Sequence, residues 1–365
     1  MNSYKKIKLS DFVYMNPSER LPKGTIARKI SMDQIEPYKK FVFSTNYEQY
    51  SGGAKFRNGD TIMARITPCL ENGKTAFVSG LAENEIAFGS TEYIVLRAKE
   101  NISIPDFVYY LAISSIIREP AIKSMVGSSG RQRVQQSVLD ELEIPLFSIA
   151  DQQHIVDILG TLDDKIENLE KTNTNLQELC LIKFRNIFSE VEKTTLSDIA
   201  VITMGQSPAG NTLNEYTGTV FYQGRTDFGF RYPTIRLYTS EPKRIAKTND
   251  ILLSVRAPVG DVNIAFEDCC IGRGIAAISS EYRSFVYYAL IVQSADFDIY
   301  NNSGTIFGSI NKEALASFKI PASNMELVKT FEKFANAIDT KIYYNTLEIS
   351  KMKKLKELYL QKFFG

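Results

Sequence analysis

The stretch GDTIMARITP at residues 59–68 returns in altered form as NDILLSVRAP at residues 249–258. Four further pairs keep the same order along the chain: LSDFV at 9–13 with LSDIA at 196–200, FVYYLA at 107–112 with FVYYAL at 285–290, LDELEIPL at 139–146 with LASFKIPA at 315–322, and LDDKIENL at 162–169 with IDTKIYYN at 338–345. A repeat that keeps its order over such a length indicates a tandem duplication, so the architecture consists of two alike halves.

Each half begins as a mixed α/β domain. Short β-branched runs such as DTIMARI, EYIVLRA and DILLSVRA are bounded by Gly, Asn or Pro, which is typical of strands. A helical stretch is expected at each FVYY segment, and a last strand at Ile144-Pro145 in the first half and at Ile320-Pro321 in the second.

After this last strand, each half changes to the alternating four-three spacing of a heptad repeat. The first stripe comprises Ile155, Leu159, Leu162, Ile166, Leu169, Leu176 and Ile187, with Asn173, Cys180 and Lys183 completing the spacing. The second comprises Phe331, Ala335, Ile338, Ile342, Ile349, Met352 and Phe363, with Asn345 as its polar interruption.

The charges of these two stretches are complementary. Residues 151–190 carry four Lys or Arg against eight Asp or Glu, whereas residues 322–365 carry eight against five. An intramolecular antiparallel pair is the simplest arrangement, and it would place the α/β domains at opposite ends. In the alternative, each stripe packs on its own domain; the polar Asn in each stripe favours the pair.

We therefore predict an α+β protein in which two duplicated mixed α/β domains are separated by two long antiparallel coiled-coil helices. The expected boundaries are 1–150 for the first domain, 151–190 for the central helix, 191–321 for the second domain and 322–365 for the C-terminal helix.

Composition narrows the class of protein. The 365 residues are 44% hydrophobic and 23% charged, which is the profile of a soluble folded chain. No apolar run approaches the roughly 20 residues needed to cross a bilayer, and the first residues are polar, so we expect a cytoplasmic protein with no membrane partner. Four cysteines without CxxC spacing and the single His154 predict no metal site. Since the net charge is only +1, any nucleic-acid surface must be local.

The sequence lacks the familiar catalytic motifs. Asn16-Pro17-Ser18 is the nearest string to an adenine-methyltransferase tetrapeptide, and it lacks the second proline and the aromatic residue. The segment ENGKT at 71–75 ends like a phosphate-binding loop, but Pro68 stands where that loop requires glycine. We expect no cofactor and no catalytic residue, although acid–base chemistry by carboxylates alone stays open.

Polar loops suited to phosphates and base edges stand in place of a catalytic site. Arginine can bond bidentately to guanine and glutamine to adenine, while glycine lets a backbone approach a phosphate. A solvated surface turn is the alternative interpretation of each loop. The candidate DNA-binding residues are Lys55, Arg57, Arg65, Ser128, Arg131, Gln132, Arg133, Gln206, Gln223, Arg225, Arg256, Arg273 and Thr305.

Six passages of the sequence carry a family resemblance. MGQSPAGNTLNEYTGTVFYQGRTDFG at 204–229, NDILLSVRAPVGDVNIA at 249–265 and CIGRGIAAI at 270–278 closely resemble a target-recognition domain of type I restriction-modification specificity subunits. KFRNGDTIMARITPCLENGKTAF at 55–77 and FGSTEYIVLRA at 88–98 look like another subclass of that domain, and residues 144–167 are similar to the helical region that follows it.

The resemblance implies a DNA-recognition subunit without catalytic activity. Each domain would read one half of a split asymmetric site in double-stranded DNA, two methyltransferase subunits would methylate adenines, and restriction subunits would cleave. The two helices would form the spacer and the docking surface for the methyltransferases. Their expected residues are Leu162, Ile166, Leu169, Asn173, Leu176, Ile338, Ile342, Asn345, Ile349 and Met352. The alternative function is a coiled-coil protein-interaction scaffold without DNA binding, and an enzyme with an unfamiliar site ranks third.

Overall fold

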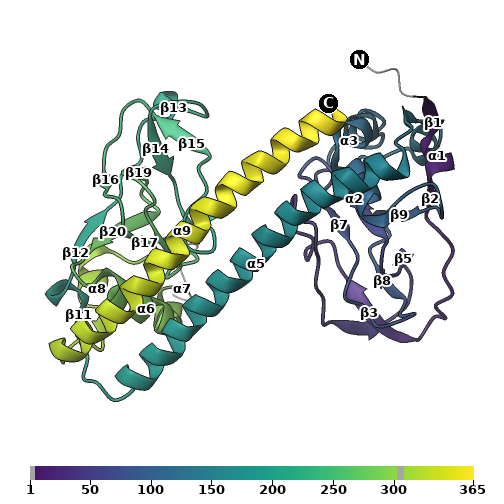
Figure 1. Ribbon diagram of the computed structural model, residues 1–365. Coiled ribbons are helices and arrows are strands. Elements are labelled where there is room, and N and C mark those ends of the chain that lie inside the picture. The colour runs from purple at the N-terminus through teal and green to yellow at the C-terminus, as the bar shows by residue number, and fades with distance from the viewer. Residues whose placement is uncertain (1–4, 302–307) are drawn as a thin grey trace. The chain divides into compact units, whose positions relative to one another are not determined.

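The computed structural model describes residues 5–301 and 308–365, and the chain divides into two compact units. Unit 1 comprises Met1–Leu169 and Leu347–Gly365, and unit 2 comprises Glu170–Thr346. Each unit therefore holds one α/β domain together with a segment of each of the two long helices, α5 (Ile149–Phe188) and α9 (Met325–Phe364) (Figure 1).

Unit 1 is built on two four-stranded sheets. The first has the antiparallel order β2-β9-β6-β7, and the second has the order β4-β3-β8-β5 with a parallel β3–β8 pair. The strands are β1 (Lys6–Lys8), β2 (Val13–Met15), β3 (Ile26–Ile30), β4 (Tyr47–Gln49), β5 (Lys55–Phe56), β6 (Thr61–Ala64), β7 (Thr75–Phe77), β8 (Ala87–Gly89), β9 (Tyr93–Ala98) and β10 (Glu143–Pro145). The short helices are α1 (Leu9–Phe12), α2 (Pro105–Ile113), α3 (Ser115–Lys123) and α4 (Gln136–Asp140).

Unit 2 repeats this plan. Its sheets have the orders β12-β20-β17-β18 and β13-β15-β14-β19-β16, again with one parallel pair, β14–β19. The strands are β11 (Thr194–Thr195), β12 (Val201–Met204), β13 (Leu213–Asn214), β14 (Thr219–Tyr222), β15 (Leu237–Thr239), β16 (Ile245–Ala246), β17 (Ile251–Ser254), β18 (Val262–Ile264), β19 (Cys269–Ile271), β20 (Ile275–Ser279) and β21 (Lys319–Ile320). The helices are η1 (Leu196–Asp198), η2 (Gly210–Thr212), η3 (Arg225–Asp227), α6 (Arg283–Val292), η4 (Ser294–Phe297), α7 (Asp298–Asn301) and α8 (Lys312–Ala316).

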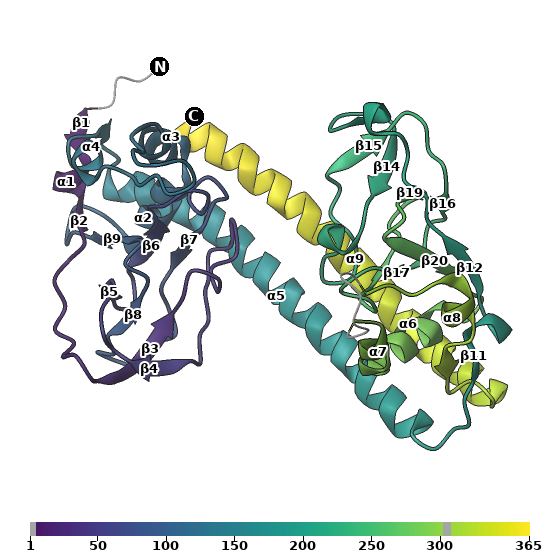
Figure 2. The same ribbon diagram turned by 180° about the vertical axis from the view of Figure 1, so that it is seen from behind.

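The two units confirm the duplication element by element. Strand β6 corresponds to β17, β9 to β20, and helix α2 to α6, and in each unit the first and last strands pair with each other, β1 with β10 and β11 with β21. Figure 2 shows β14, β15 and β19 lying beyond β17 and β20, on the side away from α6 and α8.

The central strands are apolar on both faces because each face packs into a different part of the core. In β17, Leu253 packs against α6, while Leu252 belongs to the core beneath the second sheet. In β6, Met63 and Ile62 divide in the same way. Because successive strand residues point to opposite faces, a strand buried between a helix and a sheet is apolar throughout.

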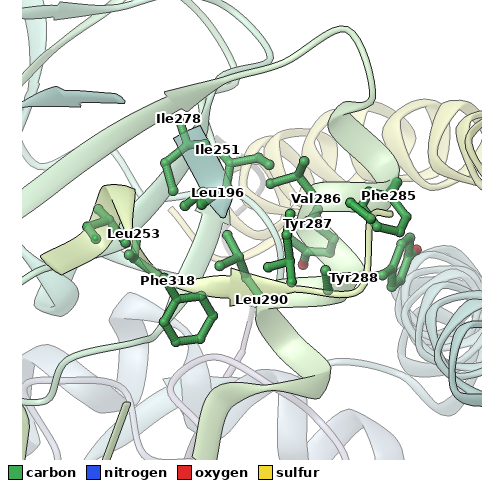
Figure 3. Close-up of a cluster of buried hydrophobic side chains, with 14 of the residues drawn as sticks. Leu196, Ile251, Leu253, Ile278, Phe285, Val286, Tyr287, Tyr288, Leu290 and Phe318 are labelled. Carbon is green, nitrogen blue, oxygen red and sulfur yellow. The ribbon is translucent and has the colours of Figure 1, made fainter. Parts of the chain in front are cut away.

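Helix α6 is buried on nearly every side because it lies between the sheet and the long helices. Figure 3 shows Phe285, Val286 and Leu290 of α6 among Ile251 and Leu253 of β17. The side chain of Phe285 lies 5.5 Å from that of Phe184 in α5, measured between ring centroids.

The long helices run antiparallel, as predicted. Within unit 1, Ile166 and Leu169 of α5 pack with Ile349 and Met352 of α9. Within unit 2, the rings of Phe184 of α5 and Phe331 of α9 lie 5.3 Å apart. The α9 residues that contact α5 therefore have lower residue numbers as the α5 residue numbers rise, which is the pattern of an antiparallel pair. Helices packed on their own domains alone are therefore excluded.

The buried stripe departs from the predicted spacing at the helix ends. Phe364 is buried instead of the predicted Phe363, and Phe184 and Phe188 are buried while Ile187 is only half-buried. An α-helix has 3.6 residues per turn, so its buried face drifts from a strict seven-residue repeat. A search of the described helices for candidate membrane spans found none.

Candidate nucleic-acid interface

Four loops of unit 2 meet beyond one end of the strands β12, β14, β17 and β19, and we name them the unit 2 loop cluster. They are residues 205–209, 223–227, 255–261 and 272–274. The Gln206 amide donates to the Ile271 carbonyl at 2.9 Å, the Gly272 amide donates to the Tyr222 carbonyl at 2.8 Å, and the Val255 amide donates to the Gly274 carbonyl at 2.9 Å. These backbone bonds hold loops from distant parts of the chain in one place.

Glycines permit this close approach. A Cβ atom added at Gly205 would lie 2.1 Å from the carbonyl oxygen of Gly272, and one added at Gly274 would lie 2.8 Å from that of Gln223. The backbones therefore touch where any side chain would collide.

Five of the predicted DNA-binding residues gather in the unit 2 loop cluster with exposed side chains. They are Gln206, Gln223, Arg225, Arg256 and Arg273.

Two carboxylates that were not predicted from the sequence organise this cluster. The buried Asp227 accepts the backbone N–H of Gln223 at 2.7 Å and pairs with Arg236 at 2.6 Å, and Asp261 pairs with Arg225 at 2.5 Å. The position of Asp227 at the end of a Gly-Arg-Thr-Asp turn was the available signal for its role.

In unit 1 a second group forms around the end of β6. The backbone of Arg133 forms isolated β-bridges with Ile66 and with Val126. The backbone N–H of Thr67 donates to the Gln132 carbonyl at 3.0 Å. The predicted residues Ser128, Arg131 and Arg133 are exposed, and Gln132 is half-buried.

Glu92 holds the guanidinium of Arg133 by one edge. The Nε atom lies 3.0 Å from both carboxylate oxygens and the Nη2 atom lies 2.7 Å from Oε1. This ion pair raises the pKa of Arg133, first through the hydrogen bond and then through the opposite charge. Glu92 was not among the predicted residues.

Arg65 and Arg256 are not equivalent, although both precede a proline. Ala64 at the end of β6 and Ser254 at the end of β17 have equivalent pairing positions in their sheets. Arg65 therefore corresponds to Val255, and Arg256 lies one position further along the chain. The partly buried Arg65 donates to the Val134 carbonyl at 3.2 Å, whereas Arg256 is exposed. A shift of one residue along an extended chain turns the side chain to the other face.

The structure separates Lys55 and Arg57 from the other unit 1 candidates. They lie near the start of β6, where Lys55 donates to the carbonyl of Glu19 and the Arg57 backbone N–H donates to Asp60 at 2.8 Å. Arg65 and Arg133 lie at the opposite end of that strand. Thr305 lies outside the described residues. Asn301, which precedes it, is tied to the backbone of Val259 by two hydrogen bonds.

The ten helix residues named for partner docking are mostly inaccessible, since six are buried and four are half-buried. Ile166 and Leu169 pack with Ile349 and Met352, Asn173 bonds Asn345, and Ile338 packs on the core of its own domain. These side chains therefore leave the outer faces of the helices for any partner. The buried ones are Ile166, Leu169, Asn173, Ile342, Asn345 and Ile349, and the half-buried ones are Leu162, Leu176, Ile338 and Met352.

Buried ionic groups fasten each domain to the helices. In unit 1 the Tyr110 hydroxyl donates to Asp163 at 2.8 Å, and Lys356 pairs with the same carboxylate at 2.6 Å. In unit 2 the Tyr288 hydroxyl donates to Asp339 at 2.8 Å, but the cation there is Arg231 of the domain itself, 2.6 Å away.

The tyrosines in these two groups stay protonated. Burial raises the pKa of both phenols far above its ordinary value, so each O–H remains available to its carboxylate. The two equivalent groups therefore keep the tyrosine and the aspartate and differ in the source of the cation.

Comparison with known proteins gives one family for both halves. Residues 1–178 and 189–358 match the type I restriction modification DNA specificity domain. The chain is similar to a Methanocaldococcus jannaschii protein named for the specificity subunit of the type I restriction enzyme MjaX, with 32% identity over 83% of this chain and 77% of that protein. It is also similar to the EcoAI specificity subunit of Escherichia coli, with 32% identity over 35% of this chain and 22% of that protein.

A solved structure shares the fold. The chain is similar to a type I restriction-modification S subunit from M. genitalium, with a TM-score of 0.61 and 18% identity, over the whole of this chain and 97% of that one.

Proposed function

The chain belongs to the type I restriction modification DNA specificity family, and from this premise we propose that each unit reads one half of a bipartite asymmetric DNA site. The role of the chain is sequence-specific DNA recognition. The duplicated domain with two different loop sets is the observation that carries the proposal, because two alike scaffolds with unlike loops suit two different half-sites.

The unlike loops support an asymmetric site. In unit 1 the polar groups come mainly from 128–133, with two exposed arginines and a half-buried glutamine. In unit 2 they come from four loops, with two glutamines and three arginines. Since arginine favours guanine and glutamine favours adenine, the two units would read different bases.

The chemistry would come from partners. The relatives are named as subunits of restriction enzymes, which supports a chain that positions methyltransferase and restriction subunits and carries out no catalysis itself. Among the described residues, no group of His, Cys, Asp and Glu could hold a metal ion. A scaffold without DNA binding lacks comparable support.

The outer faces of the long helices would dock the methyltransferase subunits. When the two 40-residue helices are aligned at their first residues, Leu179 of α5 corresponds to Leu355 of α9 and Ile182 corresponds to Leu358. All four side chains are exposed, Leu179 and Ile182 by 49% each, Leu355 by 42% and Leu358 by 62%. Exposed apolar residues at equivalent positions suit two copies of one partner.

The proposal is tested by mapping methylated bases in cells that contain the methyltransferase genes with and without this chain. We expect methylation at a bipartite site only when the chain is present. Exchanging residues 191–321 for those of a relative should change one half-site and leave the other. Methyl transfer by the chain without partners, or no change in the methylome, would contradict the proposal.

A further inference from the structure

The ion pair between Arg225 and Asp261 uses only one of the three nitrogen atoms of the guanidinium group. The Nε atom of Arg225 lies 2.5 Å from Oδ2 of Asp261, and both side chains are about half exposed. No acceptor among the described residues bonds Nη1 or Nη2, so the outer pair of N–H groups is available to a ligand.

Both partners have fixed backbones. The loop that carries Arg225 is held by Asp227, which accepts the N–H groups of Gln223 and Gly224. The turn that carries Asp261 is held by the buried Ser254, whose hydroxyl accepts the Asp261 N–H at 2.9 Å and donates to the Pro258 carbonyl at 2.8 Å.

This arrangement suits a base edge better than a phosphate. The carboxylate offsets the charge of Arg225, which weakens a long-range attraction to phosphate, yet it leaves two directed donors in one plane. Two parallel donors match the O6 and N7 acceptors of guanine in the major groove. Because the side chain is already ordered, less conformational entropy is lost on binding.

The other arginines of the interface differ. Arg133 of unit 1 has its Nε and Nη2 edge bonded to Glu92, and its Nη1 atom donates to the Arg131 carbonyl at 3.4 Å, so all three of its nitrogen atoms already have a partner. Arg256 and Arg273 are exposed and form no ion pair with any residue that the structure describes, which is typical of phosphate contacts.

We propose that Asp261 positions Arg225 to read a guanine in the half-site of unit 2. Asp261 is then a specificity-determining residue that acts through the arginine and does not itself bond the base. The inference rests on the proposed function and adds to it one residue pair and one base.

The test uses the full chain in complex with its methyltransferase subunits. Affinity is measured by fluorescence anisotropy for the mapped site. It is also measured for duplexes in which each guanine of the unit 2 half-site is replaced in turn by each of the other three bases. Asp261→Ala, which removes the acceptor of the Arg225 Nε–H, and Arg225→Ala should each lower discrimination at the same single guanine by about 5- to 150-fold, which is the effect of one bidentate base contact. The double variant should lose no more than Arg225→Ala alone. Arg225→Lys, which keeps the charge but not the planar fork, should also lose discrimination.

Lys247→Ala is the matched control. Lys247 forms an exposed ion pair with Asp268 in the same unit, 2.8 Å apart, but precedes β17 instead of following it. This variant should keep full discrimination. Thermal melting of every variant confirms that unit 2 is folded.

Two results would overturn the inference. If Arg225→Ala weakened binding equally to all sequences, Arg225 would contact phosphate. If Asp261→Ala kept discrimination that Arg225→Ala lost, Asp261 would have no positioning role. Failure of the proposed function itself is distinct, because the unaltered complex would then show no sequence preference.

Discussion

The side-chain amide of Asn345 in α9 donates a hydrogen bond to Oδ1 of Asn173 in α5, at a distance of 2.7 Å. Both side chains are buried where the apolar stripes of the two helices are interrupted. A buried amide that finds its partner in only one alignment favours that register of the helix pair.

Replacing one of these asparagines should cost more stability than replacing both. Asn173→Leu leaves the Asn345 amide buried without its acceptor, so we expect a loss of about 1–3 kcal/mol. Asn173→Leu with Asn345→Leu removes both polar groups and should be nearly neutral or stabilising. Urea unfolding followed by circular dichroism measures both. A double variant as unstable as the single one would show that the pair contributes a net attraction.

Arg231 should be essential for the stability of unit 2. It is 1% exposed, pairs with Asp339 and lies with its guanidinium carbon 4.2 Å from the ring centroid of Tyr287. Arg231→Met leaves Asp339 as an uncompensated buried charge, so the free energy of unfolding should fall by about 3–5 kcal/mol. Lys247→Met breaks only an exposed pair and should leave the unfolding midpoint unchanged. Equal effects of the two variants would contradict this role.

Arg131 should contact phosphate. Its side chain is exposed and forms no ion pair within residues 5–301 and 308–365. For Arg131→Ala in the complex with its partners, we expect weaker binding to all sequences alike. The slope of log K against log salt concentration should shrink by about 1. Anisotropy titrations at several salt concentrations provide the slope. A change confined to one base position would instead make Arg131 a base reader.

Stability should depend on pH through Glu332 of α9. Burial raises the pKa of this carboxyl above its ordinary value of 4.5, although the Phe285 N–H donates to it at 2.8 Å. The folded state therefore favours the protonated form. That contribution to stability is fully present below about pH 4.5 and is lost as the pH rises through the raised pKa.

Glu332→Gln keeps an acceptor for the Phe285 N–H and removes the titration. We expect a higher melting temperature than that of the unaltered protein at pH 7, with a difference that shrinks toward pH 4.5. Glu178→Gln, at an exposed glutamate of the same unit, should leave the profile unchanged. A lower melting temperature for Glu332→Gln at every pH would contradict the prediction.

The sequence by itself determined the duplication, the order of elements and the antiparallel helix pair. Each follows from local periodicity or from repeated strings: the stripe through Ile166 and Ile349 marks a buried helix face, and FVYY marks the same helix in each half. It also identified the exposed arginines and glutamines of the unit 2 loops, because glycine-rich turns keep polar side chains at the surface.

Only the tertiary structure decided which of these residues act together. Arg65 and Arg256 both stand between a strand and a proline in the sequence, but they occupy neighbouring positions of equivalent strands, so Arg65 is partly buried and Arg256 is exposed. Arg231 resembles any surface arginine until Asp339, more than 100 residues away, is brought beside it. Asp261 and Glu92 acquire their roles in the same way. Local spacing fixes which face of a strand or helix a side chain occupies, whereas its partner across the fold depends on which loops the sheets bring together.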